Sequence, residues 1–344
     1  MLLSSEPGEF PLGHPLPTVR PALPDAGFAC VLCQSVGSLD IGPNLDFPGA
    51  RICRCDRCGL ISTSPLPNDA RLEDLYRRQY RQVRNEAPDR TYLRDLDARA
   101  QAQLAFVHGD GAVDLRDARV LDVGCSAGSF LKACSRWTPS LAGFEPDDVM
   151  RRAATDRLPE TARLEETIFR RDRLPGQTYE LIAASHVLEH VPHPVSFVSS
   201  LCDLLSDRGV LMIEVPNEDL LTLENALASG QRGRMHLFFF SPDSLRSTIE
   251  AAGGQIVRIA SFGGPKTASP GFAGRARNFK SRLKKLVEGS SDPSVMKGLY
   301  RLRNLPKGYS RRRLMAIERG LDGEYLRVLV RENFLRSSKE IHHV

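Results

Sequence analysis

The stretch from Arg119 to Phe130, RVLDVGCSAGSF, constrains the fold of this chain more than any other. Val120, Leu121 and Val123 are typical of a strand buried on both faces, and small residues form a turn directly after it. Where a parallel strand leads into a helix, free backbone N–H groups and the positive end of the helix dipole face outward. The stretch therefore predicts an α/β fold with a cofactor crevice at this turn.

A second signal for a cofactor lies at Glu145, seventeen residues after Gly128. Glu145 ends a strand-like run, LAGF, so its carboxylate is expected at the tip of the neighbouring strand, where it can bind both hydroxyls of a ribose. Asp122 would be costly to bury inside its strand without hydrogen-bond donors. The residues expected to bind the cofactor are Asp122, Gly124, Cys125, Ser126, Gly128, Glu145 and, from a later strand, His186.

Four cysteines near the start of the chain have the spacing of a metal site. Cys30-x-x-Cys33 and Cys55-x-x-Cys58 are separated by 21 residues, which is typical of two zinc knuckles. Four thiolates complete a tetrahedral Zn²⁺ site and leave no open position, so the predicted role is structural. Cys53 lacks the knuckle spacing and stays outside the predicted site.

The later pattern predicts further strands at Tyr179–His186 and Val210–Val215, and a last strand in which Arg327 and Arg331 lie on a polar face. The chain is expected to divide into a flexible proline-rich lead-in (1–28), a zinc ribbon (29–64), linking helices (65–110), an α/β core (111–264), a basic helical insertion (265–322), and a last strand and tail (323–344).

The net charge of +5 hides an uneven distribution. From Pro265 to the end there are 19 Lys and Arg against 7 Asp and Glu, a net charge of +12, while residues 1–264 carry 28 against 35, a net charge of −7. Such a basic region is typical of an anionic partner or surface, although a solvated helical face explains it equally well. A basic amphipathic helix around Phe279–Val287 is expected there.

These motifs together resemble the class I S-adenosylmethionine-dependent methyltransferases, from about Arg90 to Arg331. VLDVGCSAGSF is similar to the first motif of that family, Glu145 to its ribose-binding acid, YELIAASHVLEHVPHP to its fourth-strand motif and LLSDRGVLMIEVPN to its fifth strand. Ser126 stands where the family commonly has glycine. The resemblance implies a doubly wound, mostly parallel seven-stranded sheet in the order 3-2-1-4-5-7-6, with S-adenosylmethionine as cofactor.

The candidate catalytic residues follow the fourth strand. His186, Glu189 and His190 form an H-x-x-E-H pattern, and His236 lies on a later loop expected to return to the same crevice. The pattern is similar to the E-x-x-E-H of metal-dependent O-methyltransferases, with His186 in place of the first glutamate. Three interpretations stay open: a second divalent metal held by the four side chains, a metal-free site in which His190 or His236 is the general base, and a structural role as helix cap.

The zinc ribbon, ending CDRCGLISTSPLP, resembles a module found in enzymes that methylate sugars and cell-surface polysaccharides. The expected function is therefore O-methylation of a saccharide or a lipid-linked glycan. The alternatives are a sugar C-methyltransferase, an RNA methyltransferase and a non-catalytic cofactor-binding scaffold. RNA is disfavoured, because aromatic residues for base stacking are sparse in the basic region.

The expected location is the cytoplasm, with peripheral contact at an anionic membrane surface. No run of about 18 apolar residues is found. The first ten residues, MLLSSEPGEF, also lack a signal-peptide pattern.

Overall fold

The computed structural model describes residues 28–67, 72, 88–109, 111, 113–218, 223, 235–265, 318 and 323–332. Residues 1–27 of the predicted lead-in, most of the first part of the predicted linking helices (68–87, except 72) and nearly all of the basic insertion lie outside these described residues. Among the described residues, no helix is both long enough and apolar enough to cross a membrane.

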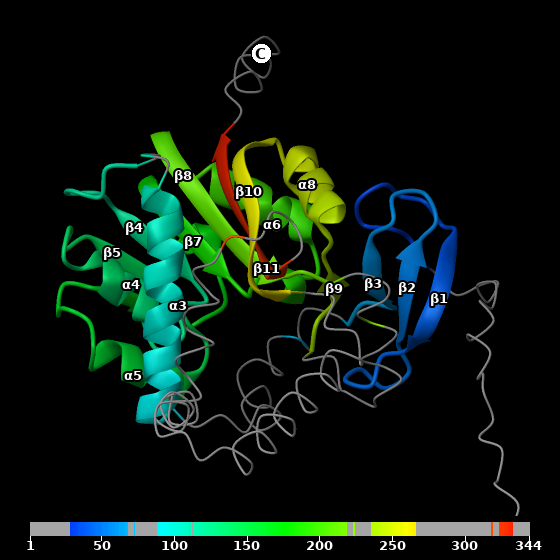
Figure 1. Ribbon diagram of the computed structural model, residues 1–344, viewed down its shortest axis with the longest axis horizontal. Helices are drawn as coiled ribbons and strands as arrows, with labels where there is room; N and C mark the ends of the chain where they lie inside the picture. Colours follow the sequence, from blue (N-terminus) through cyan, green and yellow to red (C-terminus); the bar gives the residue numbers. More distant parts are fainter. Residues whose placement is uncertain are drawn as a thin grey trace, which may run out of the picture.

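A seven-stranded sheet forms the centre of the larger module (Figure 1). Its strands are β4 (Val120–Val123), β5 (Leu141–Phe144), β6 (Arg163–Glu165), β7 (Tyr179–Ser185), β8 (Leu205–Pro216), β10 (Gly254–Pro265) and β11 (Gly323–Glu332). They lie in the order β10-β11-β8-β7-β4-β5-β6, and β11 is antiparallel to both of its neighbours. The predicted strand order and the antiparallel last strand are therefore confirmed.

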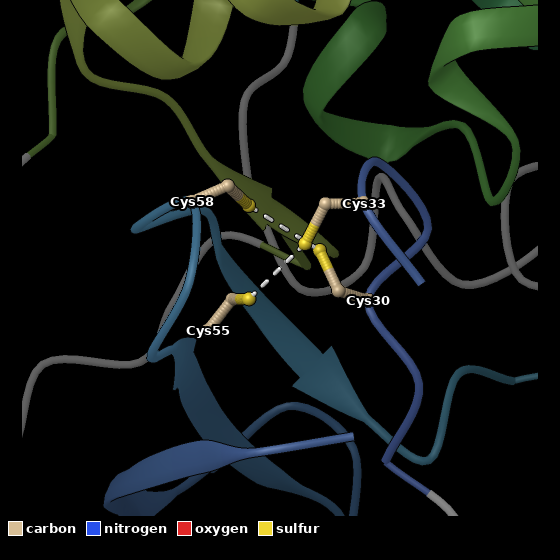
Figure 2. Close-up of side chains that lie close together, drawn as sticks. All are labelled: Cys30, Cys33, Cys55 and Cys58. Atoms are coloured by element: carbon tan, nitrogen blue, oxygen red, sulfur yellow. Dashed lines mark hydrogen bonds between the residues drawn. The ribbon is translucent and has the colours of Figure 1, made fainter. Parts of the chain in front are cut away.

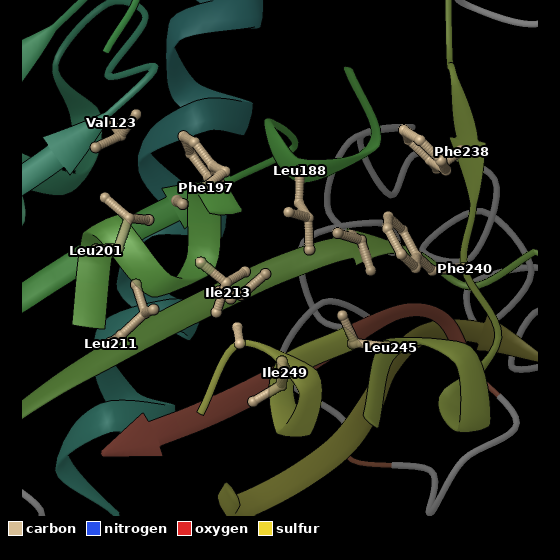
Figure 3. Packing of buried hydrophobic residues seen from close by; sticks show 14 of the residues in the cluster. Val123, Leu188, Phe197, Leu201, Leu211, Ile213, Phe238, Phe240, Leu245 and Ile249 are labelled. Atoms are coloured by element: carbon tan, nitrogen blue, oxygen red, sulfur yellow. The ribbon is translucent and has the colours of Figure 1, made fainter. Parts of the chain in front are cut away.

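Helices cover both faces of this sheet because its central strands are apolar on both sides. They are α3 (Arg90–His108), α4 (Ser129–Cys134), α5 (Asp148–Thr155), α6 (Pro194–Cys202) and α8 (Pro242–Ala251). Val210 and Met212 of β8 pack in one core with α3 and α4, while Leu211 and Ile213 pack in the other with α6 and α8. Figure 3 shows the second core, in which Phe197 and other side chains of α6 and α8 surround β8.

The amino-terminal module is a small antiparallel sheet, and its fourth strand comes from a later part of the chain. Its own strands are β1 (Ser38–Pro43), β2 (Arg51–Cys55) and β3 (Ile61–Ser64), and its fourth is β9 (Phe238–Phe239), which follows β8 in the chain. β3 and β9 lie side by side where the two modules meet (Figure 1). The two modules therefore share backbone hydrogen bonds as well as apolar contacts.

The predicted polar face of the last strand is wrong at Arg327. Its side chain is fully buried and its Nε donates a hydrogen bond to Glu214, directly opposite on β8. Because the two opposite charges satisfy each other, a charged residue fits inside the sheet here.

Candidate functional site

The four cysteines of the amino-terminal module converge on one point (Figure 2). Their Sγ atoms all lie within 4.8 Å of one another, with 3.5 Å between Cys30 and Cys58 and between Cys33 and Cys55. A zinc ion with four Zn–S bonds of about 2.3 Å needs sulfur separations of about 3.8 Å, so this set fits Zn²⁺. Cys53 is buried outside the group, as predicted.

Each knuckle closes through its own backbone. The N–H of Gln34 donates to the carbonyl of Cys30 at 2.9 Å, and the N–H of Gly59 donates to the carbonyl of Cys55 at 3.1 Å. Gly59 has a φ of 72°, in the left-handed region that glycine adopts without strain. The cysteine spacing therefore forms a preorganised metal site.

The turn after β4 is built for close approach of a ligand to its backbone. Gly124, Ser126 and Gly128 all have left-handed φ values, of 73°, 50° and 70°. A Cβ on Gly124 would lie 2.6 Å from Cγ2 of Val187, so only glycine fits there. Cys125 turns the other way and packs in the core beneath α4.

The carboxylate of Glu145 faces this turn from the tip of β5. Its Oε2 accepts a hydrogen bond from the N–H of Ser126 and its Oε1 accepts one from the N–H of Asp147, both at 2.8 Å. These two donors fix the carboxylate at the tip of β5, beside the turn. Burial, and then the charge of Glu145, raise the pKa of Asp122 well above its usual range. The residues present thus fit S-adenosylmethionine.

Asp97 on α3 braces the far side of the turn, and the sequence alone did not reveal this contact. It accepts hydrogen bonds from Oγ of Ser129 at 2.7 Å, from Nζ of Lys132 at 3.0 Å and from the guanidinium of Arg157. Arg157 also donates to the carbonyl of Ala127 at 2.7 Å. The helix that precedes the core therefore holds the first turn of α4 in place.

The predicted catalytic side chains gather beyond β7, as the pattern indicated. Oε1 of Glu189 lies 3.9 Å from Nε2 of His190 and 4.0 Å from Nε2 of His236. The centroids of the two imidazole rings are 5.0 Å apart. All three residues are buried. Although burial alone would raise it, the surrounding histidines hold the pKa of Glu189 at about 2.

The far nitrogen of each ring has a fixed partner. Nδ1 of His190 lies 3.1 Å from the carbonyl oxygen of Met235, and Nδ1 of His236 lies 3.2 Å from Oε2 of Glu218. A carbonyl or carboxylate oxygen accepts a hydrogen bond, so Nδ1 carries the proton in both rings. Nε2 of each ring is therefore the nitrogen on the side of Glu189.

His186 belongs to a second, adjoining network. Its Nδ1 is 3.2 Å from Oε1 of Glu189 and its Nε2 is 3.4 Å from Oε1 of Glu214. Burial and Arg99 would lower the pKa of His186, but hydrogen bonds to the two glutamates raise it above its usual value. Gln103 of α3 donates to Glu214 at 3.0 Å.

The histidine cluster lies beside the cofactor turn. β7 runs parallel to β4 as its direct neighbour, and Val187 is the residue that a Cβ on Gly124 would meet. His186 itself has a φ of 57°, a strained conformation for a non-glycine residue, which ends the strand and starts the segment Leu188–His190. A cofactor at the turn would therefore be adjacent to the cluster.

The amino-terminal module holds the loop that carries His236. Asp46 accepts a hydrogen bond from the N–H of Met235 at 2.7 Å, and Oγ of Thr63 donates to the carbonyl of His236 at 3.2 Å. Asn44 donates to Thr63 at 2.8 Å. The position of His236 thus depends on residues far away in the chain.

Comparison with known proteins bears on the larger module. Residues 92–259 match the family model described as "Methyltransferase domain". Together with the Rossmann-like sheet, this identifies a class I S-adenosylmethionine-dependent methyltransferase domain within the chain.

Similar curated proteins include two ubiquinone biosynthesis O-methyltransferases. The one from Salmonella arizonae is 30% identical over 105 residues, 29% of this chain and 43% of that protein. The one from Vibrio cholerae is 25% identical over 118 residues, 33% of this chain and 48% of that protein. The matched region therefore spans less than half the length of these curated relatives.

Among solved structures, the 1,6-didemethyltoxoflavin-N1-methyltransferase of Burkholderia thailandensis is 14% identical, with a TM-score of 0.48, covering 85% of this chain and 99% of that chain. The magnesium protoporphyrin IX methyltransferase of Synechocystis is 17% identical, with a TM-score of 0.43, covering 56% and 92%.

Proposed function

We propose that this protein transfers the methyl group of S-adenosylmethionine to a hydroxyl group of a saccharide or glycoconjugate. The observation that carries the proposal is the buried group of Glu189, His190 and His236 beside the cofactor turn. A hydroxyl must lose its proton as its oxygen attacks a methyl carbon, and imidazole and carboxylate groups are suited to that task.

The cofactor would be held at the turn after β4. Glu145, which is held against the turn by the N–H of Ser126, would accept hydrogen bonds from the ribose hydroxyls. S-adenosylmethionine, when bound, supplies a methyl group on a sulfonium, which is transferred by in-line displacement. The protein's contribution is then to orient the acceptor and remove its proton.

The cluster offers two routes for that proton. Nε2 of His236 can accept it, and the carboxylate of Glu218 at Nδ1 would stabilise the resulting imidazolium. Alternatively, a divalent ion held by the cluster would lower the pKa of the hydroxyl. Both routes require His190 or His236 and support the same reaction.

Three observations support the class of acceptor. The curated relatives are O-methyltransferases by name, which favours a hydroxyl acceptor. The saccharide rests on the resemblance of the zinc ribbon to modules in sugar-methylating enzymes. A lipid-linked glycan and contact with an anionic membrane surface rest on the 15 Lys and Arg against 4 Asp and Glu in residues 265–322.

The test is to incubate the protein with methyl-labelled S-adenosylmethionine and with separate glycan, lipid, phenol and RNA fractions. We expect label in the glycan or glycolipid fraction. His190→Ala and His236→Ala are expected to lower the rate about 10²-fold or more, and His193→Ala, an exposed histidine on the same segment, is the matched control. Label only in phenols or RNA, no transfer at all, or parental rates in both variants would contradict the proposal.

A further inference from the structure

We propose that Glu189, His190 and His236 form a binding site for one divalent transition-metal ion, separate from the four-cysteine cluster. The inference deepens the proposed function and rests on it for its catalytic role, because an ion here would bind the acceptor hydroxyl. Metal binding itself can be measured without any methyl acceptor.

The ligand atoms already surround one point. One carboxylate oxygen and two imidazole nitrogens from these residues all lie within 4.8 Å of one another. Bonds of about 2.1 Å in tetrahedral geometry place ligand atoms about 3.4 Å apart. The 3.9 Å and 4.0 Å separations from Glu189 to the two rings therefore need to close by only about half an ångström.

The carboxylate of Glu189 is buried, and one of its oxygens accepts no hydrogen bond. Glu189 is 1% exposed, and its Oε2 is buried without a hydrogen-bond partner. Leaving such an acceptor unsatisfied costs about 1–3 kcal/mol, and more when it is charged. A cation bound by this carboxylate would offset the burial of its charge.

The outer contacts are those of metal-binding histidines. Met235 and Glu218 accept from Nδ1 of the two rings, which leaves Nε2 of both rings on the side of Glu189. Metal-ligating histidines almost always donate their other N–H to a carbonyl or carboxylate in this way. The pairing fixes the tautomer that a metal requires.

His186 is not part of this ligand set, although the sequence pattern had included it. Its two nitrogens face Glu189 and Glu214, at 3.2 Å and 3.4 Å, so it orients the carboxylate from outside. The site then has three protein ligands and open positions for a substrate oxygen. Two imidazoles favour Zn²⁺ or Co²⁺ over Mg²⁺, which prefers oxygen ligands.

In the reaction, the ion would lower the pKa of the acceptor hydroxyl, which loses its proton to water. The hydroxyl oxygen forms a bond to the methyl carbon as the carbon–sulfur bond breaks. The products are a methyl ether and S-adenosylhomocysteine, and no oxidation state of the metal changes.

The test begins with the protein whose cysteine cluster is already loaded with zinc. This protein is titrated with Co²⁺, and binding is measured by calorimetry and visible absorption. We expect one equivalent to bind with the spectrum of nitrogen and oxygen ligands, without sulfur-to-cobalt charge transfer. Glu189→Gln and His236→Ala are expected to weaken binding at least about tenfold, while His193→Ala binds as the parent does. Should His236→Ala unfold, Glu189→Gln and His236→Gln, which keep polar groups, take its place.

The absence of Co²⁺ binding in the parent protein, or an unchanged affinity in folded variants at position 189 or 236, would overturn the proposal. A thiolate spectrum for the added ion would also overturn it. S-adenosylmethionine binding, measured on the same preparation, separates the two claims. Cofactor binding and methyl transfer without Co²⁺ binding would refute the metal site and leave the proposed function standing.

Discussion

Asp122 lies inside β4 with almost no exposed surface, where burial and the neighbouring Glu145 raise the pKa of its carboxyl. For a carboxyl whose pKa is raised on folding, the stability it contributes is present below its unfolded pKa of about 3.9 and is lost as pH rises. The cofactor turn is therefore built on a residue that destabilises the protein near neutral pH.

Asp122→Asn is expected to stabilise the protein at pH 8 by about 1–3 kcal/mol, because an amide has no charge to bury. At pH 4 the effect should nearly vanish, since Asp122 is then protonated in the folded protein and only partly ionised in the unfolded one. Thermal unfolding of the variant and the parent at both pH values measures this. Asp148→Asn, at an exposed carboxylate, is the control, and equal effects of Asp122→Asn at both pH values would refute the account.

Among single residues, those that could be predicted from the sequence are the ones that lie at a regular distance from a recognisable strand or motif. Glu145 follows β5 directly, and Glu189 and His190 lie within five residues of the end of β7, so their place at the edge of the sheet could be predicted. Glu214 and Gln103 were missed because their contacts depend on how α3 docks on the sheet. Glu214 in VLMIEV and Arg327 in LRVLV, opposite charges in two apolar strands, were a signal that they pair.

Among the elements, the pairing of β3 with β9 has the largest consequence for the site. It joins Ile61 to Phe239 and Ser62 to Phe238, and the loop just before β9 carries His236. Asp46, between β1 and β2, accepts from the N–H of Met235 in that loop. The amino-terminal module thus helps to position the loop that carries His236.

Asp46→Ala is expected to lower the free energy of unfolding by about 1–3 kcal/mol, because the N–H of Met235 loses its acceptor. It should also shift the imidazole NMR signals of His190 and His236, because Met235 and His236 lie on the released loop. Asp46→Asn keeps an acceptor oxygen and should leave both signals in place. Unmoved histidine signals in Asp46→Ala would show that Asp46 does not position the cluster.

The order of the seven strands could be predicted because each parallel strand has its own apolar run and each motif marks a strand end. The β3–β9 pairing could not, because β9 has only two residues and no pattern of its own. It arises from docking of modules whose paired residues are more than 170 positions apart, such as Thr63 and His236.

In the molecule as a whole, both modules contribute to the candidate active site. The larger sheet supplies the cofactor turn and Glu189, and the amino-terminal module fixes the loop of His236. The four-cysteine cluster packs in the same apolar core as Leu188 and Phe240. A metal in that cluster would therefore stabilise the framework of the site without touching the acceptor.

The central claim is that the turn after β4 binds S-adenosylmethionine, and calorimetric titration of the cofactor into the protein tests it most directly. We predict that the parent protein binds one equivalent of the cofactor. In Glu145→Ala the affinity should be about 10- to 100-fold lower, because the hydrogen bonds to the ribose are lost. Glu166→Ala, which changes an exposed glutamate nearby, should keep the parental affinity. No binding by the parent, or equal affinity in Glu145→Ala and the parent, would contradict the claim.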